Sequence, residues 1–197
     1  MRHIEEVYGG QVRFGFVMGG LVEDVSKFND PLNKIGGAQF AGQVAAHWEE
    51  ASRRHGMPVD AGVWNDMQNE FTSTWPANIA FKAAELQDPL KATVYLRRLR
   101  EAAAAERLLI HRRDVQLQLA RETGLDHERF VLGLDSGAAA AAFQRDLREC
   151  RATPVTGLPS FQLSNRQGGR LMSFGLHPYP APGEPLARRP AGGRSAS

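Results

Sequence analysis

The sequence predicts an α/β protein in which a long helical block interrupts a small sheet. Three observations support this prediction: an alternating apolar segment near the N-terminus, helical spacing from about residue 38 to 151, and two short apolar runs on either side of an Asn- and Gly-containing turn. Alternation with a period of two indicates a strand, and apolar residues three or four apart indicate a helix. An order of strand, helices and strands is typical of an α/β fold with a helical insertion.

The first strand is predicted over residues 11–21. Every second residue from Val12 to Met18 is apolar, and Val17 makes the other face partly apolar as well. A strand that is apolar on both faces is typical of the inside of a parallel sheet. Before it, residues 1–9 are predicted to be the last turns of a helix that ends at a pair of glycines.

Helix starts and stops recur through residues 38–151. Gly56 is expected to end the first helix, and Pro76 lies where a first helical residue is expected. Asp88, which is followed by proline, predicts a capped helix start. Further helices are predicted to begin at Asp114, Asp126 and Ser136.

After residue 152 the sequence again has the pattern of β-strands. Residues 158–163 and 170–176 are predicted to form an antiparallel hairpin, because the SNRQGG sequence between them suits a tight turn. Together with residues 11–21, these strands are expected to form one small sheet. Residues 180–197 are rich in Pro, Gly, Arg and Ser and are predicted to be disordered.

Composition and charge exclude several classes of function. The net charge of +2 arises from interleaved acidic and basic residues, which argues against a nucleic-acid groove. No segment approaches the ~20 apolar residues of a membrane span, and the N-terminus lacks the apolar region of a secretory signal. One cysteine in 197 residues fits a reducing compartment. We therefore expect a cytoplasmic protein with no nucleic-acid or membrane partner.

Other chemistry-bearing residues give weak signals. The six histidines show no metal-ligand spacing, and the glycine pairs lack a phosphate-binding pattern, so neither a metal nor a cofactor is predicted. Cys150 shares an apolar helix face with Phe143 and Leu147, as a buried hydrophobic cysteine does. Residues 73–78 either line a groove or simply cap a helix. The three tryptophans are interpreted as core residues, with a ligand cleft as the alternative.

Five stretches, in this order, resemble the DsbA family of thioredoxin-fold proteins: RFGFVMGGLVEDVSKFNDPLN, VAAHWEEASRRHGMP, STWPANIAFKAAELQ, YLRRLREAAAAE and VTGLPSFQL. The resemblance is strongest to the cytoplasmic FrnE-like branch, which is related to adaptors that present substrates to the ClpXP protease. It extends from about Val12 to Pro178.

The resemblance implies a thioredoxin-like, DsbA-type fold with a large helical insertion. Its core would comprise residues 1–37 and 152–179, its insertion residues 38–151, and its tail residues 180–197. In the family, a first strand and a C-x-x-C motif precede the point where this chain starts, so the resemblance implies a truncated chain. The first cysteine of that motif is the nucleophile, and it has no counterpart in this sequence.

The same resemblance points to a substrate-binding loop at Gly157, Leu158 and Pro159. In the family, this loop faces the reactive disulfide, contains a cis X–Pro bond, and pairs its backbone with a bound polypeptide. Leu158–Pro159 is therefore expected to be cis, although an ordinary trans proline at the start of a strand is the alternative. No catalytic residue is implied.

Three functions follow from the resemblance. The first is a thiol–disulfide oxidoreductase-like protein that is redox-inactive because the C-x-x-C motif is absent. The second is a non-enzymatic polypeptide-binding or adaptor protein, and the third a relative of glutathione-dependent isomerases. Polypeptide or thiol substrates are the expected partners. Loss of the first strand would leave a gap of about two 4.8 Å strand spacings, so we also expect marginal stability and self-association through open sheet edges.

Overall fold

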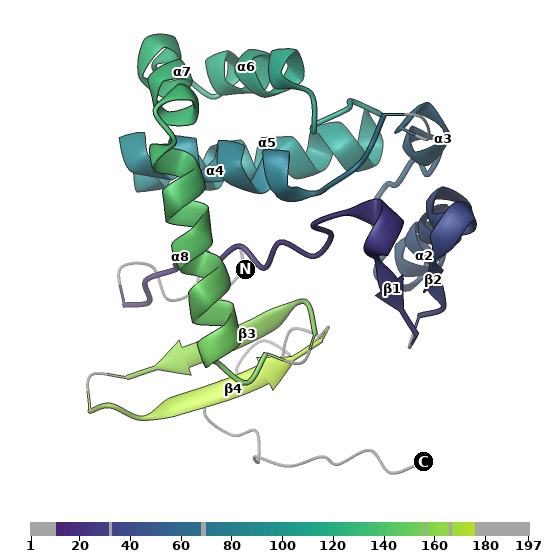
Figure 1. Ribbon diagram of the computed structural model, residues 1–197. Helices are drawn as coiled ribbons and strands as arrows, with labels where there is room; N and C mark the ends of the chain where they lie inside the picture. The colour runs from purple at the N-terminus through teal and green to yellow at the C-terminus, as the bar shows by residue number, and fades with distance from the viewer. Residues whose placement is uncertain (1–10, 32, 68–69, 156, 166, 176–197) are drawn as a thin grey trace. The chain divides into compact units, whose positions relative to one another are not determined.

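The computed structural model describes residues 11–31, 33–67, 70–155, 157–165 and 167–175 (Figure 1). It divides into two compact units, of which the first ends at Thr153 and the second begins at Pro154. The helix predicted over residues 1–9 and the tail predicted over residues 180–197 lie outside the described residues. No helix in the described ranges is long and apolar enough to cross a membrane.

Five helices surround the main core of the first unit (Figure 1). They are α4 (Trp75–Gln87), α5 (Pro89–Ala105), α6 (Arg113–Glu122), α7 (His127–Asp135) and α8 (Ala138–Ala152). Helix α4 packs against α5, α7 and α8, which its small side chains Ala80, Ala83 and Ala84 permit. The largest fully buried side chains of this core are Tyr95, Phe81, Phe130, Phe143 and Leu119.

A second, smaller apolar cluster lies in the N-terminal half of the same unit. Its elements are η1 (Val25–Lys27), β1 (Asn29–Asp30), β2 (Ile35–Gly36), η2 (Gly37–Gln39), α2 (Phe40–His55) and α3 (Val63–Met67). Strands β1 and β2 form a two-residue antiparallel pair, which the sequence pattern did not predict because so short a strand has no periodicity. Gly36 is required here, since a Cβ would lie 2.7 Å from the carbonyl oxygen of Phe28.

The predicted helix boundaries are mostly confirmed. Gly56 ends α2 in the left-handed conformation, and Pro76 lies in the first turn of α4. Asp88 accepts hydrogen bonds from the backbone of Leu90 and Lys91, and Asp126 accepts one from that of Arg129. Two predicted starts are displaced. Helix α6 begins one residue before Asp114, and Gly137 rather than Ser136 precedes α8.

The strand predicted over residues 11–21 is wrong. Its alternation indicates burial only in part, since Met18 is buried and Phe16 packs edge-on against Phe81, whereas Val12 is 42% exposed. However, no other described segment pairs with this backbone. The Met18 N–H instead donates to Asp146 Oδ2 at 2.8 Å on α8. Side-chain spacing reports which face is buried, whereas a strand also requires a neighbouring backbone.

The second unit is the predicted antiparallel hairpin, which is confirmed with shorter strands. Strand β3 (Ser160–Ser164) pairs with β4 (Arg170–Phe174), and Gln162 is opposite Met172. Asn165 closes the turn by accepting hydrogen bonds from the backbone N–H groups of Gln167 and Gly169. The described strands form two separate two-stranded sheets, so the single sheet predicted from residues 11–21, 158–163 and 170–176 is wrong.

Candidate functional site

The candidate site predicted from the sequence is the loop of Gly157, Leu158 and Pro159, directly before β3. The Leu158–Pro159 bond is cis, as expected, which confirms the bond geometry. The Ser160 hydroxyl donates to the carbonyl oxygen of Gly157, and the Gly175 N–H donates to that of Pro159 at 2.9 Å. The hairpin therefore holds both ends of the loop.

Leu158 differs from its two neighbours because its backbone makes no hydrogen bond within the described part of the chain. Its side chain is 52% exposed. Among the described residues, the loop thus presents an N–H and a C=O without a partner, together with an apolar side chain, at the start of a strand. A backbone of this kind can accept an added extended segment.

Apolar side chains continue from the loop along one face of the hairpin. Leu163 lies opposite Leu171, and Phe161 lies two residues before Leu163 on the same face. All three side chains are between 38% and 48% exposed. This face offers apolar contact area but no acid, base or nucleophile.

Cys150 lies near the C-terminal end of α8, in the other unit. Burial, together with the negative charges of Asp146 and Glu149, raises the pKa of its thiol. A raised pKa leaves less of the nucleophilic thiolate at neutral pH. Cys150 is only half-buried and lies outside the apolar core that contains Phe143 and Leu147, so the predicted buried position is wrong, whereas the raised pKa agrees with an unreactive thiol.

The residues at 73–78 have a structural role. Ser73 Oγ accepts a hydrogen bond from the Trp75 N–H at 3.0 Å and donates to the carbonyl oxygen of Val22 at 2.9 Å. Asn78 donates to the carbonyl oxygen of Thr74. The capping interpretation is therefore the one that the structure supports. No group of three or more potential metal ligands occurs in the described ranges.

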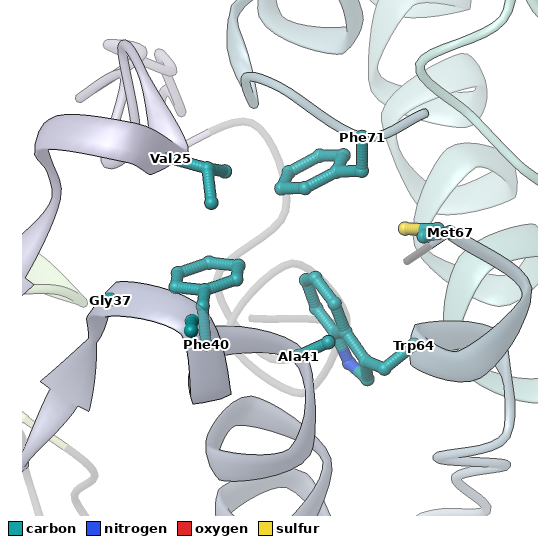
Figure 2. Close-up of a pocket in the computed structure, with 8 residues that line it drawn as sticks. Val25, Gly37, Phe40, Ala41, Trp64, Met67 and Phe71 are labelled. Atoms are coloured by element: carbon teal, nitrogen blue, oxygen red, sulfur yellow. The ribbon is translucent and has the colours of Figure 1, made fainter. Parts of the chain in front are cut away.

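A pocket that the sequence did not indicate lies between η1, α2 and α3 (Figure 2). It has a volume of ≈ 200 Å³ and is lined by Val25, Gly37, Ala38, Phe40, Ala41, Trp64, Met67 and Phe71. Trp64 meets Phe40 and Phe71 edge-on, with centroids 5.9 and 5.5 Å away. Trp64 also packs edge-on against Trp48, so the core interpretation of both tryptophans agrees with the structure. In the sequence, the small residues beside Phe40 are the one feature that indicates room for a cavity there.

Charged side chains lie beside this pocket, but they are paired with one another and are poorly suited to acid–base catalysis. Phe71 packs edge-on against His111, whose Nε2 lies 3.2 Å from Glu70 Oε1. Glu70 also accepts two hydrogen bonds, at 2.8 and 2.7 Å, from the Arg112 guanidinium. These bonds lower the pKa of Glu70, while burial lowers that of His111. Glu70 thus stays ionised and paired, so it is a poor proton donor.

A cis-proline loop directly before an antiparallel hairpin agrees with the thioredoxin-like class that the sequence resemblance implies. A family model described as thioredoxin matches residues 1–179, and the chain belongs to this family. The predicted thioredoxin-like fold with DsbA-like relatives is thereby confirmed.

Curated relatives include the ClpXP adapter protein SpxH from two bacteria. The protein from Halalkalibacterium halodurans is 30% identical over 165 residues, which are 84% of this chain and 52% of the relative. The protein from Bacillus subtilis is 33% identical over 124 residues, which are 63% of this chain and 42% of the relative. The chain thus spans about half the length of the curated relatives it matches.

Solved structures agree on the fold. A candidate protein disulfide isomerase from Nitrosomonas europaea matches with a TM-score of 0.72 and 18% identity, over 90% of this chain and 81% of that chain. The cytosolic disulfide reductase DsbM from Pseudomonas aeruginosa matches with a TM-score of 0.60 and 24% identity, over 79% and 71%. At these identities the similarity establishes fold alone.

Proposed function

We propose that this chain is a redox-inactive member of its family that binds extended polypeptide segments at Gly157, Leu158 and Pro159. The observation that supports this most directly is the unpaired backbone of Leu158 at the start of β3. An extended peptide that aligns with the loop would exchange hydrogen bonds with this N–H and C=O. Its apolar side chains would contact Leu158 and the exposed apolar face of the hairpin.

The thiol chemistry of the family's oxidoreductases is a poor fit to this sequence. Disulfide exchange proceeds through a mixed disulfide, which a second thiol of the same protein then resolves. Cys150 is the one cysteine of the chain, and its raised pKa disfavours the attacking thiolate. We therefore propose that this chain is oxidoreductase-like in fold and that it binds polypeptides.

Adaptor activity is the second candidate, and the names of the SpxH relatives favour it. An adaptor needs one surface for a client polypeptide and another for the machine that receives it. The loop would supply the first of these surfaces. We also propose a cytoplasmic location, which the name of the cytosolic DsbM supports.

The test is binding of a permanently unfolded polypeptide, reduced and carboxymethylated α-lactalbumin, measured by fluorescence anisotropy. We expect saturable binding that Leu158→Lys weakens by about tenfold, a loss of roughly 1.4 kcal/mol. The matched control is Leu132→Lys, at a 65% exposed position on α7, which should bind as the parent does. Equal binding by both variants would rule out the loop as the site.

Two further assays separate the alternatives. Insulin reduction with dithiothreitol should proceed at the uncatalysed rate, and calorimetry with glutathione should show no heat of binding. Turnover that Cys150→Ser abolishes would establish the oxidoreductase, and saturable glutathione binding would favour the isomerase relative.

A further inference from the structure

The second unit differs from the first in its balance of charge. Residues 154–197 contain five arginines, no lysine and one acidic residue, Glu184, so their formal charge is +4. The whole chain carries +2, so the first unit is net negative. No acidic residue lies between Glu149 and Glu184, a stretch that includes the cis-proline loop and both strands of the hairpin. An asymmetry of this kind within one chain indicates a partner of complementary charge.

The arginine of the hairpin has no local counter-charge. Several arginines of the first unit are paired: Arg97 Nε lies 2.7 Å from Glu101 Oε1, and Arg112 donates two hydrogen bonds to Glu70. Arg170 is the first residue of β4, it is exposed, and it contacts no carboxylate in the described part of the chain. A carboxylate that approached Arg170 would therefore form a charge-assisted hydrogen bond without displacing another one.

Arg170 and the loop lie at opposite ends of the hairpin. Ser160 is opposite Phe174 near the loop, and Ser164 is opposite Arg170 near the turn. The six positions from Leu158 to Ser164 correspond to roughly 20 Å of extended chain. The residues between these two ends are apolar or uncharged. A polypeptide that extends along the hairpin from the loop would thus meet apolar side chains first and a cation about six residues later.

We propose that the site at Gly157, Leu158 and Pro159 selects extended segments that are apolar at the loop and carry a carboxylate about six residues away, where it pairs with Arg170. This inference rests on the polypeptide-binding function proposed above and names the class of segment that the site prefers. An exposed ion pair contributes little energy, so the preference is a few-fold difference in affinity. Charge complementarity would then act on which polypeptide binds, while the backbone of the loop and the apolar contacts hold it.

Three 13-residue peptides with blocked termini test this selectivity by fluorescence anisotropy with the full chain. They share an uncharged interior of Val, Leu, Ser and Thr, and they carry Glu, Gln or Lys at both ends, six positions from the centre. Either direction of binding therefore brings one end residue toward Arg170. In about 20 mM salt, the Glu peptide should bind roughly twofold to fivefold more tightly than the Gln peptide, and the Lys peptide should bind most weakly. In about 500 mM salt the three affinities should converge, because exposed charges are then screened.

Variants of the hairpin arginine show whether it is the selecting charge. Arg170→Gln should remove the difference between the Glu and Gln peptides, and Arg170→Glu should make the Lys peptide bind most tightly. Both variants should bind the Gln peptide as the parent does, which would show that the hairpin still folds. The matched control is Arg129→Glu, at an exposed position on α7. It changes the net charge as Arg170→Glu does and should keep the preference for the Glu peptide.

The outcomes separate this inference from the proposed function. If all three peptides bind equally and Leu158→Lys weakens the Gln peptide, the selectivity is wrong and the binding function stands. If carboxymethylated α-lactalbumin binds and no peptide does, the inference is again overturned. If neither binds, both proposals fail. A preference that survives Arg170→Gln would overturn the role of the hairpin. Displacement of the Glu peptide by a single-stranded oligothymidylate would also overturn it, because the positive charge would then serve nucleic acid.

Discussion

The buried charges between α4 and α8 provide a quantitative prediction. Asp146 Oδ2 accepts the Met18 N–H at 2.8 Å and lies 3.0 Å from Lys82 Nζ. The side chains of Lys82 and Asp146 are only 6% and 11% exposed. Lys82 has a second partner in Glu85, which is more exposed. Asp146 therefore joins α4, α8 and the segment that precedes η1.

Asp146→Ala removes one charge of a buried pair, and such changes cost about 3–5 kcal/mol. We expect a value near the lower limit, about 3 kcal/mol, because Lys82 retains Glu85. Part of this loss, roughly 1–3 kcal/mol, would come from the buried Met18 N–H that is left without an acceptor. Against a total stability of about 5–15 kcal/mol, the change is large but still permits a folded protein.

Urea unfolding followed by circular dichroism at 222 nm measures the effect. The midpoint should fall by roughly 1–3 M, since typical slopes are about 1–3 kcal/mol per molar urea. Glu149→Ala, an exposed change on the same helix, should stay within about 0.5 kcal/mol of the parent. Lys82→Met combined with Asp146→Leu should cost less than the two single changes together, because no unpaired charge remains. A loss below about 1 kcal/mol for Asp146→Ala would refute this account.

Three further predictions concern other residues. Cys150→Ser should leave thiol-dependent turnover of insulin at the uncatalysed rate of the parent, because the raised pKa of the thiol disfavours its thiolate, and any difference would show that the thiol is reactive. Burial lowers the pKa of His111 below its ordinary 6.5. The unfolded chain then binds a proton that the folded chain does not, so stability should fall as the pH drops through and below 6.5. His111→Gln should flatten that dependence in urea titrations at a series of pH values. Gly20→Ala should lower stability by about 1–3 kcal/mol in thermal or urea unfolding, because Gly20 has a φ of +57° and a Cβ would lie 2.8 Å from Phe143 Cζ. An unchanged midpoint would show that Phe143 can move aside.

Local chemistry made the helical block predictable from the sequence. Asp88, Asp126 and Gly56 act within one turn of their own position, so the pattern and the structure agree on them. The hairpin was predictable for the same reason, since its turn residues lie between two adjacent apolar runs. The loop at Gly157, Leu158 and Pro159 came from a resemblance to a family. Spacing alone would not have distinguished it from an ordinary strand start.

The spacing of apolar residues could not predict contacts between residues that are distant in the sequence. The segment at 11–21 has the alternation of a strand, but Asp146, 128 residues after Met18, takes the N–H that a neighbouring strand would otherwise take. The pocket beside Phe40 arises because Phe71, 31 positions later, returns to face it. Local sequence thus determined most helix and turn boundaries to within about one residue. Only the tertiary structure decided which backbone groups are paired, because hydrogen-bond partners of an extended segment are set by whatever part of the chain folds beside it.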